Sequence, residues 1–386
     1  MTTLPIVTVA GDGRARGRAH GEALRPLIRT HVARWLDWLG VNTGAEPRAY
    51  VEALVSETNF RPAIERWTPG LLAEVRGMAE GAGVDEALIF GLQLPDEEWW
   101  FRLDRKLAAG ARPGAVGEAC SSLGVRPAAG HTPLTAQNMD MPDYMDGLQA
   151  VLRLQPSDGG PEAGPEALVF TVAGLLALNG VNRAGVSTCC NSLTELAHAA
   201  DGLPVAFVHR GLLAQPSLAA AESFVRGVRH ASGQNFLLGG RERVAAYECS
   251  AHAVVEVTAE AASPNIWHTN HALVNSDRQR SEAEFAALPP AAQQSLLRSR
   301  DNSTARYCAV EDWLQRASGP LDVAGMKAIL SGHDSPRHPV CRHKPADAGS
   351  SSFVTIGSTV MTLGEPPVLH IAPGPPCVTH FEELSF

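Results

Sequence analysis

The sequence predicts an α+β protein with a helix-rich first third and a strand-rich remainder. Between Gly21 and about Gly91, apolar residues recur at steps of three and four, which is the spacing of one helix face. After Cys120 the apolar runs become short and are separated by Gly, Pro and Asn, as in strands and turns. Of the 386 residues, 45% are apolar and 19% are charged, so intrinsic disorder is excluded for most of the chain.

Helical periodicity is clearest in two stripes of the first third. One runs from Leu24 to Leu39, and the other runs from Leu71 to Ala79. Gly81 and Gly83 follow the second stripe, as glycines do at a helix C-terminus. Similar stripes predict three later helices, at Leu218–Val228, Ser281–Leu288 and Ser303–Leu314.

The remainder of the chain contains short apolar runs of strand length. These runs predict strands at Leu134–Met139, Leu152–Leu154, Ala167–Val172, Gly185–Thr188, Val244–Glu248, Val254–Val257, Ser352–Ile356 and Val368–Ala372. Pro156–Pro165 is rich in Gly, Pro and acidic residues and is predicted to be a surface loop. Ala108–Glu118, with three glycines and a proline, is predicted to be a flexible segment just before Cys120.

The charge balance and apolar runs exclude several classes of partner. The formal net charge is −9 and no basic cluster is evident, so we expect no nucleic-acid partner. The longest apolar candidate, Ala167–Val181, is shorter than a membrane span and is interrupted by polar residues. The first ten residues lack the positive region of a signal peptide, and the seven scattered cysteines show no disulfide framework. We therefore expect a cytoplasmic protein with reduced thiols.

Two motifs invite a cofactor or metal. Gly11–Gly17 follows a strand-like run, but its third glycine comes one residue late for a dinucleotide fingerprint, so a turn into a helix is predicted instead. His268–His271 and the later His333–His343 group contain zinc-binding residue types without a paired CxxC motif. Hydrogen bonding is the expected role of these histidines, and we expect neither a metal nor a cofactor.

Cys120 is the candidate nucleophile. On local sequence alone, a buried structural thiol is an equal alternative. If the Ala119–Cys120 bond were cleaved, however, Cys120 would carry both a thiol and a free α-amine. Such an amine has an ordinary pKa of about 8 and can act as the base for its own side chain. Nucleophile and base would then belong to one residue.

Motifs spread over nearly the whole chain resemble the acyl-coenzyme A:6-aminopenicillanic acid acyltransferase family, also called isopenicillin-N acyltransferase-like, of the N-terminal nucleophile hydrolases. They are Gly17–Gly21, Glu74–Gly83, Ala119–Ser122, Gln137–Asp140, Gly180–Gly185 with Asn191, Ser232–Asn235, His268–His271, Asn302–Ser303 with Arg306, Val340–His343 and Gly374–Cys377. The resemblance implies a four-layer αββα sandwich formed by a single domain, residues 1–386. It also implies a precursor that cuts itself into a helix-rich fragment, 1–119, and a strand-rich fragment, 120–386, which carries the nucleophile.

The resemblance also implies roles for four further residues. Asn235 would stabilise the oxyanion with Asn191 near the same oxygen, Asp140 would orient the new α-amine, and Arg306 would hold the anionic groups of the site. Asp140 as a turn residue before a proline and Arg306 as a surface ion pair are the alternatives. Ala119 stands where the best-known members have Gly, and its β-carbon would slow self-cleavage.

Three aromatic residues, Trp99, Trp100 and Phe101, lie just upstream of the flexible segment and are candidates for lining an acyl pocket, with a place in the core as the alternative. The favoured function is a cysteine amidohydrolase that cleaves a small linear N-acyl amide through a thioester acyl-enzyme. Alternatives are an acyl-coenzyme A-dependent N-acyltransferase, a catalytically silent binding protein on the same fold, and a zinc amidohydrolase. The sequence leaves the substrate and homo-oligomer formation open.

Overall fold

The computed structural model describes residues 4–110, 120–128, 130–156, 164–258, 263–317, 319, 321–344 and 352–386. Within these residues two sheets are formed, and all strand pairs are antiparallel except β1 with β4. The eight-stranded sheet has the order β1 (Ile6–Val9), β4 (Gln149–Leu154), β5 (Ala167–Val172), β6 (Asn179–Asn182), β7 (Ser187–Ser192), β8 (Gln234–Gly239), β9 (Val244–Cys249) and β10 (Val254–Glu256). The six-stranded sheet has the order β11 (Asn265–His268), β2 (Ser121–Val125), β3 (Leu134–Pro142), β12 (Phe353–Thr362), β13 (Val368–Ala372) and β14 (Glu382–Ser385).

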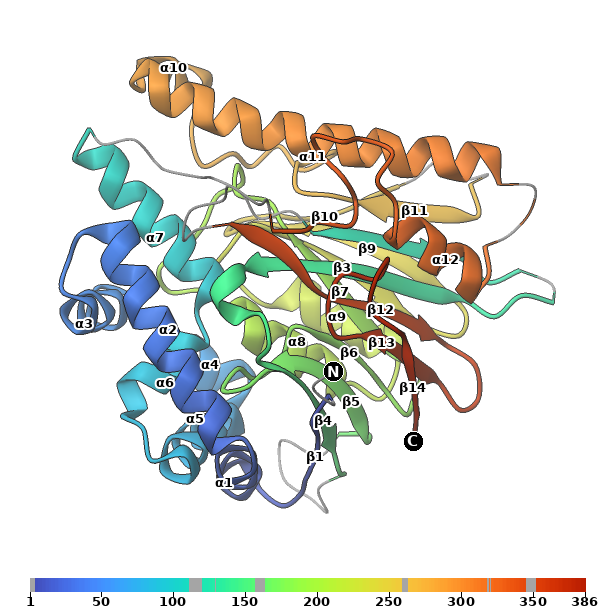
Figure 1. Cartoon of the computed structure of the whole chain (residues 1–386), viewed down its shortest axis with the longest axis horizontal. Coiled ribbons are helices and arrows are strands. Elements are labelled where there is room, and N and C mark those ends of the chain that lie inside the picture. Colours follow the sequence, from blue (N-terminus) through green and yellow to red (C-terminus); the bar gives the residue numbers. More distant parts are fainter. Residues whose placement is uncertain are drawn as a thin grey trace.

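The two sheets pack face to face, with β2 and β3 of one sheet against β7 and β8 of the other. Helices α8 (Val205–Leu213) and α9 (Leu218–Gly227) cover the outer face of the eight-stranded sheet. Helices α11 (Pro290–Arg316) and α12 (Val323–Leu330) cover the six-stranded sheet, and the short α10 (Glu282–Ala287) precedes α11 (Figure 1). The prediction of an α+β protein with a four-layer αββα sandwich is therefore confirmed.

A bundle of helices flanks the sandwich on one side (Figure 1). It comprises α1 (Gly13–Ala23), α2 (Arg25–Thr43), α3 (Pro47–Glu57), α4 (Arg61–Trp67), α5 (Pro69–Ala82), α6 (Glu86–Leu92) and α7 (Pro95–Ala108). Its apolar side chains join one hydrophobic cluster with those of the sheets, so the bundle buries its apolar face against the sandwich. A 3₁₀ turn at Asp143–Met145 contacts α2 and connects β3 to β4.

Glycines let α1 and α5 cross at backbone contact. A β-carbon on Gly17 would lie 1.8 Å from the carbonyl oxygen of Glu74, and one on Gly77 would lie 2.1 Å from that of Arg14. Both distances are far below van der Waals contact, so only glycine fits there. The Gly17–Gly21 and Glu74–Gly83 motifs thus meet in space as a helix–helix contact.

The same crossing buries an ion triad. The Glu74 carboxylate accepts hydrogen bonds from Arg16 and, in a bidentate arrangement, from Arg210 of α8 at 2.5 and 2.9 Å. All three side chains are at most 6% exposed. The two guanidinium groups outweigh the burial of Glu74 and keep its pKa below the ordinary value. The triad therefore ties the helical bundle to the layer behind the eight-stranded sheet.

Most predicted strands are present, and β5 and β13 have the predicted bounds. The strand predicted at Gly185–Thr188 begins only at Ser187, because Gly185 has a φ of 91° in the turn that precedes it. The helix predicted at Ser303–Leu314 extends over Pro290–Arg316. Gly13–Ala23 is a helix capped by the Asp12 side chain, which confirms the predicted turn into a helix. Most of the predicted loop at Pro156–Pro165 and of the predicted flexible segment lies outside the described residues.

No helix among the described residues has the length and apolar character required to cross a membrane.

Candidate active site

Cys120 lies directly before β2, at the interface between the two sheets. Its side chain is buried, with 4% of the residue exposed, and Sγ lies 3.7 Å from Sδ of Met139 and 4.0 Å from the carbonyl oxygen of Asp140. Because β2 pairs with β3 in the middle of the six-stranded sheet, the position of the thiol is fixed by strands on both sides. Ala119, the other residue of the predicted cleavage site, lies outside the described residues.

Asp140 is a fully buried carboxylate on β3. Its Oδ1 accepts a hydrogen bond of 2.5 Å from the hydroxyl of Thr355, whereas Oδ2 has no hydrogen-bond partner among the described residues. Burial raises the pKa of Asp140 to about 6, although the positive charges of Arg342 and Arg306 act in the opposite direction. The site therefore contains an acceptor atom that can still take a hydrogen bond.

Arg306 reaches the site from α11 and is fully buried. Its Nη1 donates to the carbonyl oxygen of Cys120 at 2.7 Å and to Oγ of Ser121 at 2.9 Å. Its Nη2 donates to Oδ1 of Asn270 at 2.8 Å, and its Nε donates to Oδ1 of Asn302 at 3.0 Å. Burial lowers the pKa of Arg306 to about 10, which still leaves the guanidinium charged at neutral pH. The cation thus holds the backbone on which the candidate nucleophile sits.

Asn191 and Asn235 occupy opposed positions on β7 and β8 of the facing sheet. Nδ2 of Asn235 donates to Oδ1 of Asn191 at 2.9 Å, and the same oxygen accepts from Oγ of Ser122 at 2.6 Å. Ser122 follows the candidate nucleophile by two residues, so this contact crosses between the sheets. The fold therefore brings all five predicted catalytic residues to one region.

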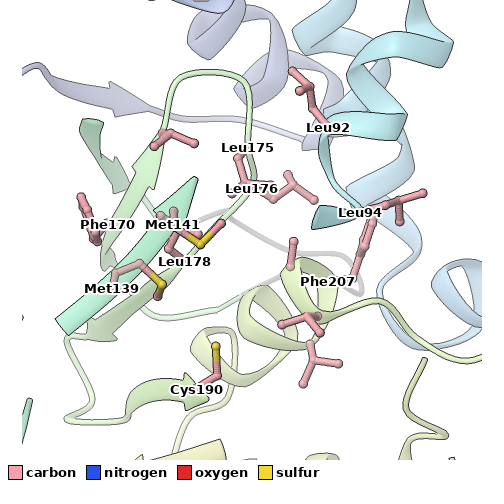
Figure 2. Packing of buried hydrophobic residues seen from close by; sticks show 14 of the residues in the cluster. Leu92, Leu94, Met139, Met141, Phe170, Leu175, Leu176, Leu178, Cys190 and Phe207 are labelled. Atoms are coloured by element: carbon pink, nitrogen blue, oxygen red, sulfur yellow. The ribbon is translucent and has the colours of Figure 1, made fainter. Parts of the chain in front are cut away.

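A narrow pocket with a cavity volume of about 20 Å³ reaches Cys120. Its lining comprises Pro95, Asp96, Cys120, Met139, Asp140, Met141, Ala177, Leu178, Cys190, Ser192, Val205, Ala206 and His209. Figure 2 shows the apolar side chains of Met139, Met141 and Leu178 close together at β3, and Cys190 of β7 apart from them. One wall of the pocket is therefore apolar, and the Cys120 thiol lies against that wall.

The three predicted aromatic residues lie on α7. Trp99 and Trp100 line a second, smaller pocket that shares Asp96 and Ser192 with the pocket at Cys120. Trp100 donates from Nε1 to Oγ of Ser232 at 3.0 Å and stacks on the ring of His198. Phe101 packs edge-on against Tyr50 in the helical bundle and lines neither of these two pockets. The structure thus places the aromatic residues next to the pocket at Cys120 but not around the thiol.

Sequence reasoning missed an acidic pair at the start of α7, in which Asp96 is half-buried and Glu97 is buried. Oδ1 of Asp96 accepts hydrogen bonds of 2.6 Å from both Ser192 and Gln234, and Oε1 of Glu97 accepts one of 2.8 Å from Ser232. Burial raises the pKa of both carboxyls, and the neighbouring Asp96 helps to raise that of Glu97 to about 8. The signal available in the sequence was the position of the acidic run Asp96–Glu98 between apolar residues on both sides.

The histidines of the His268–His271 motif have protein partners. Nε2 of His268 lies 2.8 Å from Oε1 of Glu248, and Nδ1 of His271 lies 2.8 Å from Oγ of Ser303. The hydrogen-bonding role predicted for this motif is confirmed.

A larger, basic groove was also missed. Arg278, Arg280 and Arg300 line it together with Asn270, whose side chain also contacts Arg306. Glu195 lies 3.5 Å from both Arg278 and Arg300, so their charges are partly balanced. Arg300 is distant from Arg278 and Arg280 in the sequence, so no basic cluster was evident there.

The fold and site together define an αββα protein with a cysteine directly before strand β2, in a pocket whose lining also includes Asp140. The family model described as acyl-coenzyme A:6-aminopenicillanic acid acyl-transferase matches residues 170–365, and the chain belongs to this family. The predicted resemblance is thereby confirmed. No curated protein matches the chain.

Two solved structures show a distant likeness. One is a mutant conjugated bile acid hydrolase from Clostridium perfringens, at 10% identity and a TM-score of 0.44, covering 69% of this chain and 97% of the other. The second is penicillin V acylase from Agrobacterium tumefaciens, at 14% identity and a TM-score of 0.42, covering 69% of this chain and 86% of the other. At these values neither likeness bears on the activity of this chain.

Proposed function

We propose that this chain is a self-processing cysteine amidohydrolase that cuts itself before Cys120 and then hydrolyses a small linear N-acyl amide. The observation that carries the proposal is the setting of Cys120: its thiol lies in a pocket that Asp140 also lines, and Oδ2 of the buried Asp140 has no hydrogen-bond partner among the described residues. Family membership supports the same chemistry, because the family is described by the transfer of an acyl group to an amine.

Cleavage before Cys120 would release an α-amine next to Asp140. Oδ1 of Asp140 is already bound by Thr355, so Oδ2 is the acceptor for the new amine. The amine takes the thiol proton, and the thiolate attacks the amide carbonyl carbon. The proton then passes to the leaving amine, the C–N bond breaks, and a thioester to Cys120 remains. Water adds to the thioester, and the acid product leaves with the thiol restored.

Asn235 is the proposed donor to the oxyanion of each tetrahedral intermediate. Its Nδ2 carries two hydrogens, and the contact with Asn191 uses one of them. Asn191 holds this amide in orientation while it also accepts from Ser122. Loss of a single oxyanion donor typically costs about 3 to 4 kcal/mol in the transition state.

Arg306 has a positioning role in this proposal. Its two contacts fix the Cys120 carbonyl and the Ser121 hydroxyl, so the backbone cannot rotate the thiol out of the pocket. Its charge also favours the ionised form of Asp140, because the guanidinium lowers the pKa that burial raises. An ionised Asp140 is the form that binds an ammonium group.

The pocket favours a short, apolar acyl group. Met139, Met141 and Leu178 supply apolar surface next to the thiol, and the cavity of about 20 Å³ is much smaller than a typical small-molecule site.

Acyl transfer is a second candidate function, and the basic groove favours it. Arg278 and Arg300, both next to Glu195, and Arg280, paired with Asp104, supply the guanidinium groups that an anionic acyl donor would bind. Asn270 joins this groove to the nucleophile through Arg306. Such a donor would deliver its acyl group to the same thiol, and an amine would replace water in the second step.

The test is a panel of N-acyl amines graded by acyl length, incubated with the processed protein. We expect release of the free amine and a hydroxylamine-sensitive mass increase on the fragment that begins with Cys120. Addition of acyl-coenzyme A and an amine acceptor distinguishes transfer from hydrolysis. Cys249→Ala, which removes a different buried cysteine, serves as the matched control and should retain turnover. Turnover that persists in Cys120→Ala, or a processed protein that forms no acyl adduct with any member of the panel, would overturn the proposal.

A further inference from the structure

Two histidine and two cysteine side chains meet at the surface of the protein. His333, Cys341 and His343 come from the segment that follows α12, and Cys377 comes from the turn that follows β13. All four donor atoms lie within 4.8 Å of one another. Cys341 is buried, whereas the other three residues are exposed, so the cluster is open to solvent on one side.

The spacing of the donor atoms matches one tetrahedral metal ion. Zinc bonds of about 2.3 Å to sulfur and about 2.0 Å to nitrogen place the ligand atoms of a tetrahedral site about 3.3 to 3.8 Å apart. Here the two sulfurs are 3.5 Å apart, Nε2 of His343 lies 3.1 and 3.7 Å from the sulfurs of Cys377 and Cys341, and Nε2 of His333 lies 3.9 Å from the Cys377 sulfur. The two imidazole rings stack at 5.2 Å between centroids, and both present Nε2 to the sulfur of Cys377.

We propose that His333, Cys341, His343 and Cys377 bind one zinc ion in a closed Cys₂His₂ site. Thiolate and imidazole ligands in this ratio are typical of structural zinc, and four protein ligands leave no open position for a substrate or for water. Both thiols give up their protons when the ion binds, and no bond is oxidised or reduced. This assignment departs from our expectation from the sequence that no metal is bound.

Backbone contacts prepare the cluster. The amide of Cys341 donates to the Gly332 carbonyl at 3.1 Å, which folds the chain so that His333 and Cys341 converge. The amides of Val378 and Thr379 both donate to the Pro375 carbonyl, which forms the turn that presents Cys377. The ligands therefore come from two segments that only the fold brings together, and the ion would cross-link them.

The zinc site would stabilise the support of the active site. Arg342, between two of the ligands, donates its backbone amide to Oγ1 of Thr355, and Thr355 in turn donates to Asp140. On β3, Asn138 donates to the carbonyls of Leu330 and Val340, at the two ends of the segment that precedes Cys341. Loss of the ion would loosen this segment and, through Thr355, the orientation of the Asp140 carboxylate.

The first experiment is metal analysis of the full chain purified under reducing conditions without added chelator. We expect about one zinc ion per chain, consistent with a closed structural site. Replacement of zinc by cobalt(II) should give the visible absorption of a tetrahedral cobalt–thiolate centre, and this readout needs no variant to fold. A chain that contains no zinc and gives no cobalt–thiolate absorption overturns the proposal. A disulfide between Cys341 and Cys377 in the reduced preparation also overturns it.

Variants locate the site. Cys377→Ser and His343→Ala should lose the zinc and abolish the cobalt absorption, and the midpoint of thermal unfolding should no longer fall when a chelator is added. Cys308→Ser, which removes an exposed cysteine on α11 outside the cluster, is the matched control and should behave as the parent chain. Full zinc content in Cys377→Ser contradicts the assignment. Metal content is independent of turnover, so this test is separate from that of the proposed function.

Discussion

Replacement of Asp140 by asparagine should change how the stability of the unprocessed chain depends on pH. Both chains also carry Cys120→Ala, so that neither can cut itself and release an α-amine near Asp140. Burial raises the pKa of Asp140 from an ordinary 3.8 to about 6, so the folded chain retains a proton that the unfolded chain loses. The free energy of unfolding of the chain that retains Asp140 therefore falls as the pH rises through this interval.

The magnitude follows from the pKa difference. About two pKa units correspond to about 3 kcal/mol between full protonation and full ionisation. Between about pH 4.5 and pH 7.5, about 2 kcal/mol of this total should appear. Because the asparagine side chain has no titrating proton, the Asp140→Asn chain gains this amount relative to its parent as the pH rises, and other titrating groups cancel in the comparison.

Denaturant unfolding of both chains at a series of pH values measures this difference. Asp37→Asn, an exposed carboxyl on α2, is the control and should show no pH-dependent difference of this size. An Asp140→Asn effect that is independent of pH would refute the claim that burial dominates the protonation of Asp140. An effect of opposite sign would mean that Asp140 is ionised and paired in the unprocessed chain.

Three further substitutions test the site and the fold. Arg306→Met removes the charged donor to the Cys120 carbonyl and should lower turnover of the processed enzyme about 10- to 100-fold in initial-rate assays; an unchanged rate would contradict its positioning role. Glu74→Gln leaves two buried guanidinium groups without their carboxylate and should cost about 3 to 5 kcal/mol in denaturant unfolding, and a loss below about 1 kcal/mol would contradict the triad. Gly17→Ala forces α1 away from α5 and should lower the free energy of unfolding by about 1 to 3 kcal/mol. The control, Gly40→Ala in α2, has only ordinary contacts and should be neutral or stabilising. Equal effects of the two substitutions would argue against the close helix crossing.

The sequence predicts elements best where one face is apolar and the other is polar. The stripe from Leu24 to Leu39 lies within α2, because that helix has the periodicity of a half-buried helix. Strands in the centre of the sandwich have both faces covered, so their residues do not alternate. β2 was missed because two of its five residues are serines and one is glycine, so it shows no apolar run. Gly124 is required in this strand, since a β-carbon there would lie 2.6 Å from Val244.

Helix α7 could have been predicted from its termini. Pro95 stands at its first turn, three acidic residues follow, and Arg105 and Lys106 occupy its last turn. These are favourable positions for proline and for charges relative to the helix dipole. The apolar stripe alone did not reveal this helix because Glu97 and Glu98 are buried among its aromatic residues.

Residues that meet across the fold were harder to predict from composition and spacing. Cys377 is 36 residues from Cys341, and no local motif joins them. Arg306 reaches the Cys120 carbonyl from 186 residues away. The resemblance to a family brought Asp140, Asn191, Asn235 and Arg306 to attention, whereas the contacts among them depend on the packing of the two sheets.

The intact mass of the full-length protein after purification and prolonged incubation tests the proposed self-processing most directly. We predict two fragments of 119 and 267 residues, the second beginning with Cys120, and one chain of 386 residues for Cys120→Ala. A parent chain that remains at 386 residues would contradict the account, because the thiol would then lack the α-amine that is proposed to act as its base.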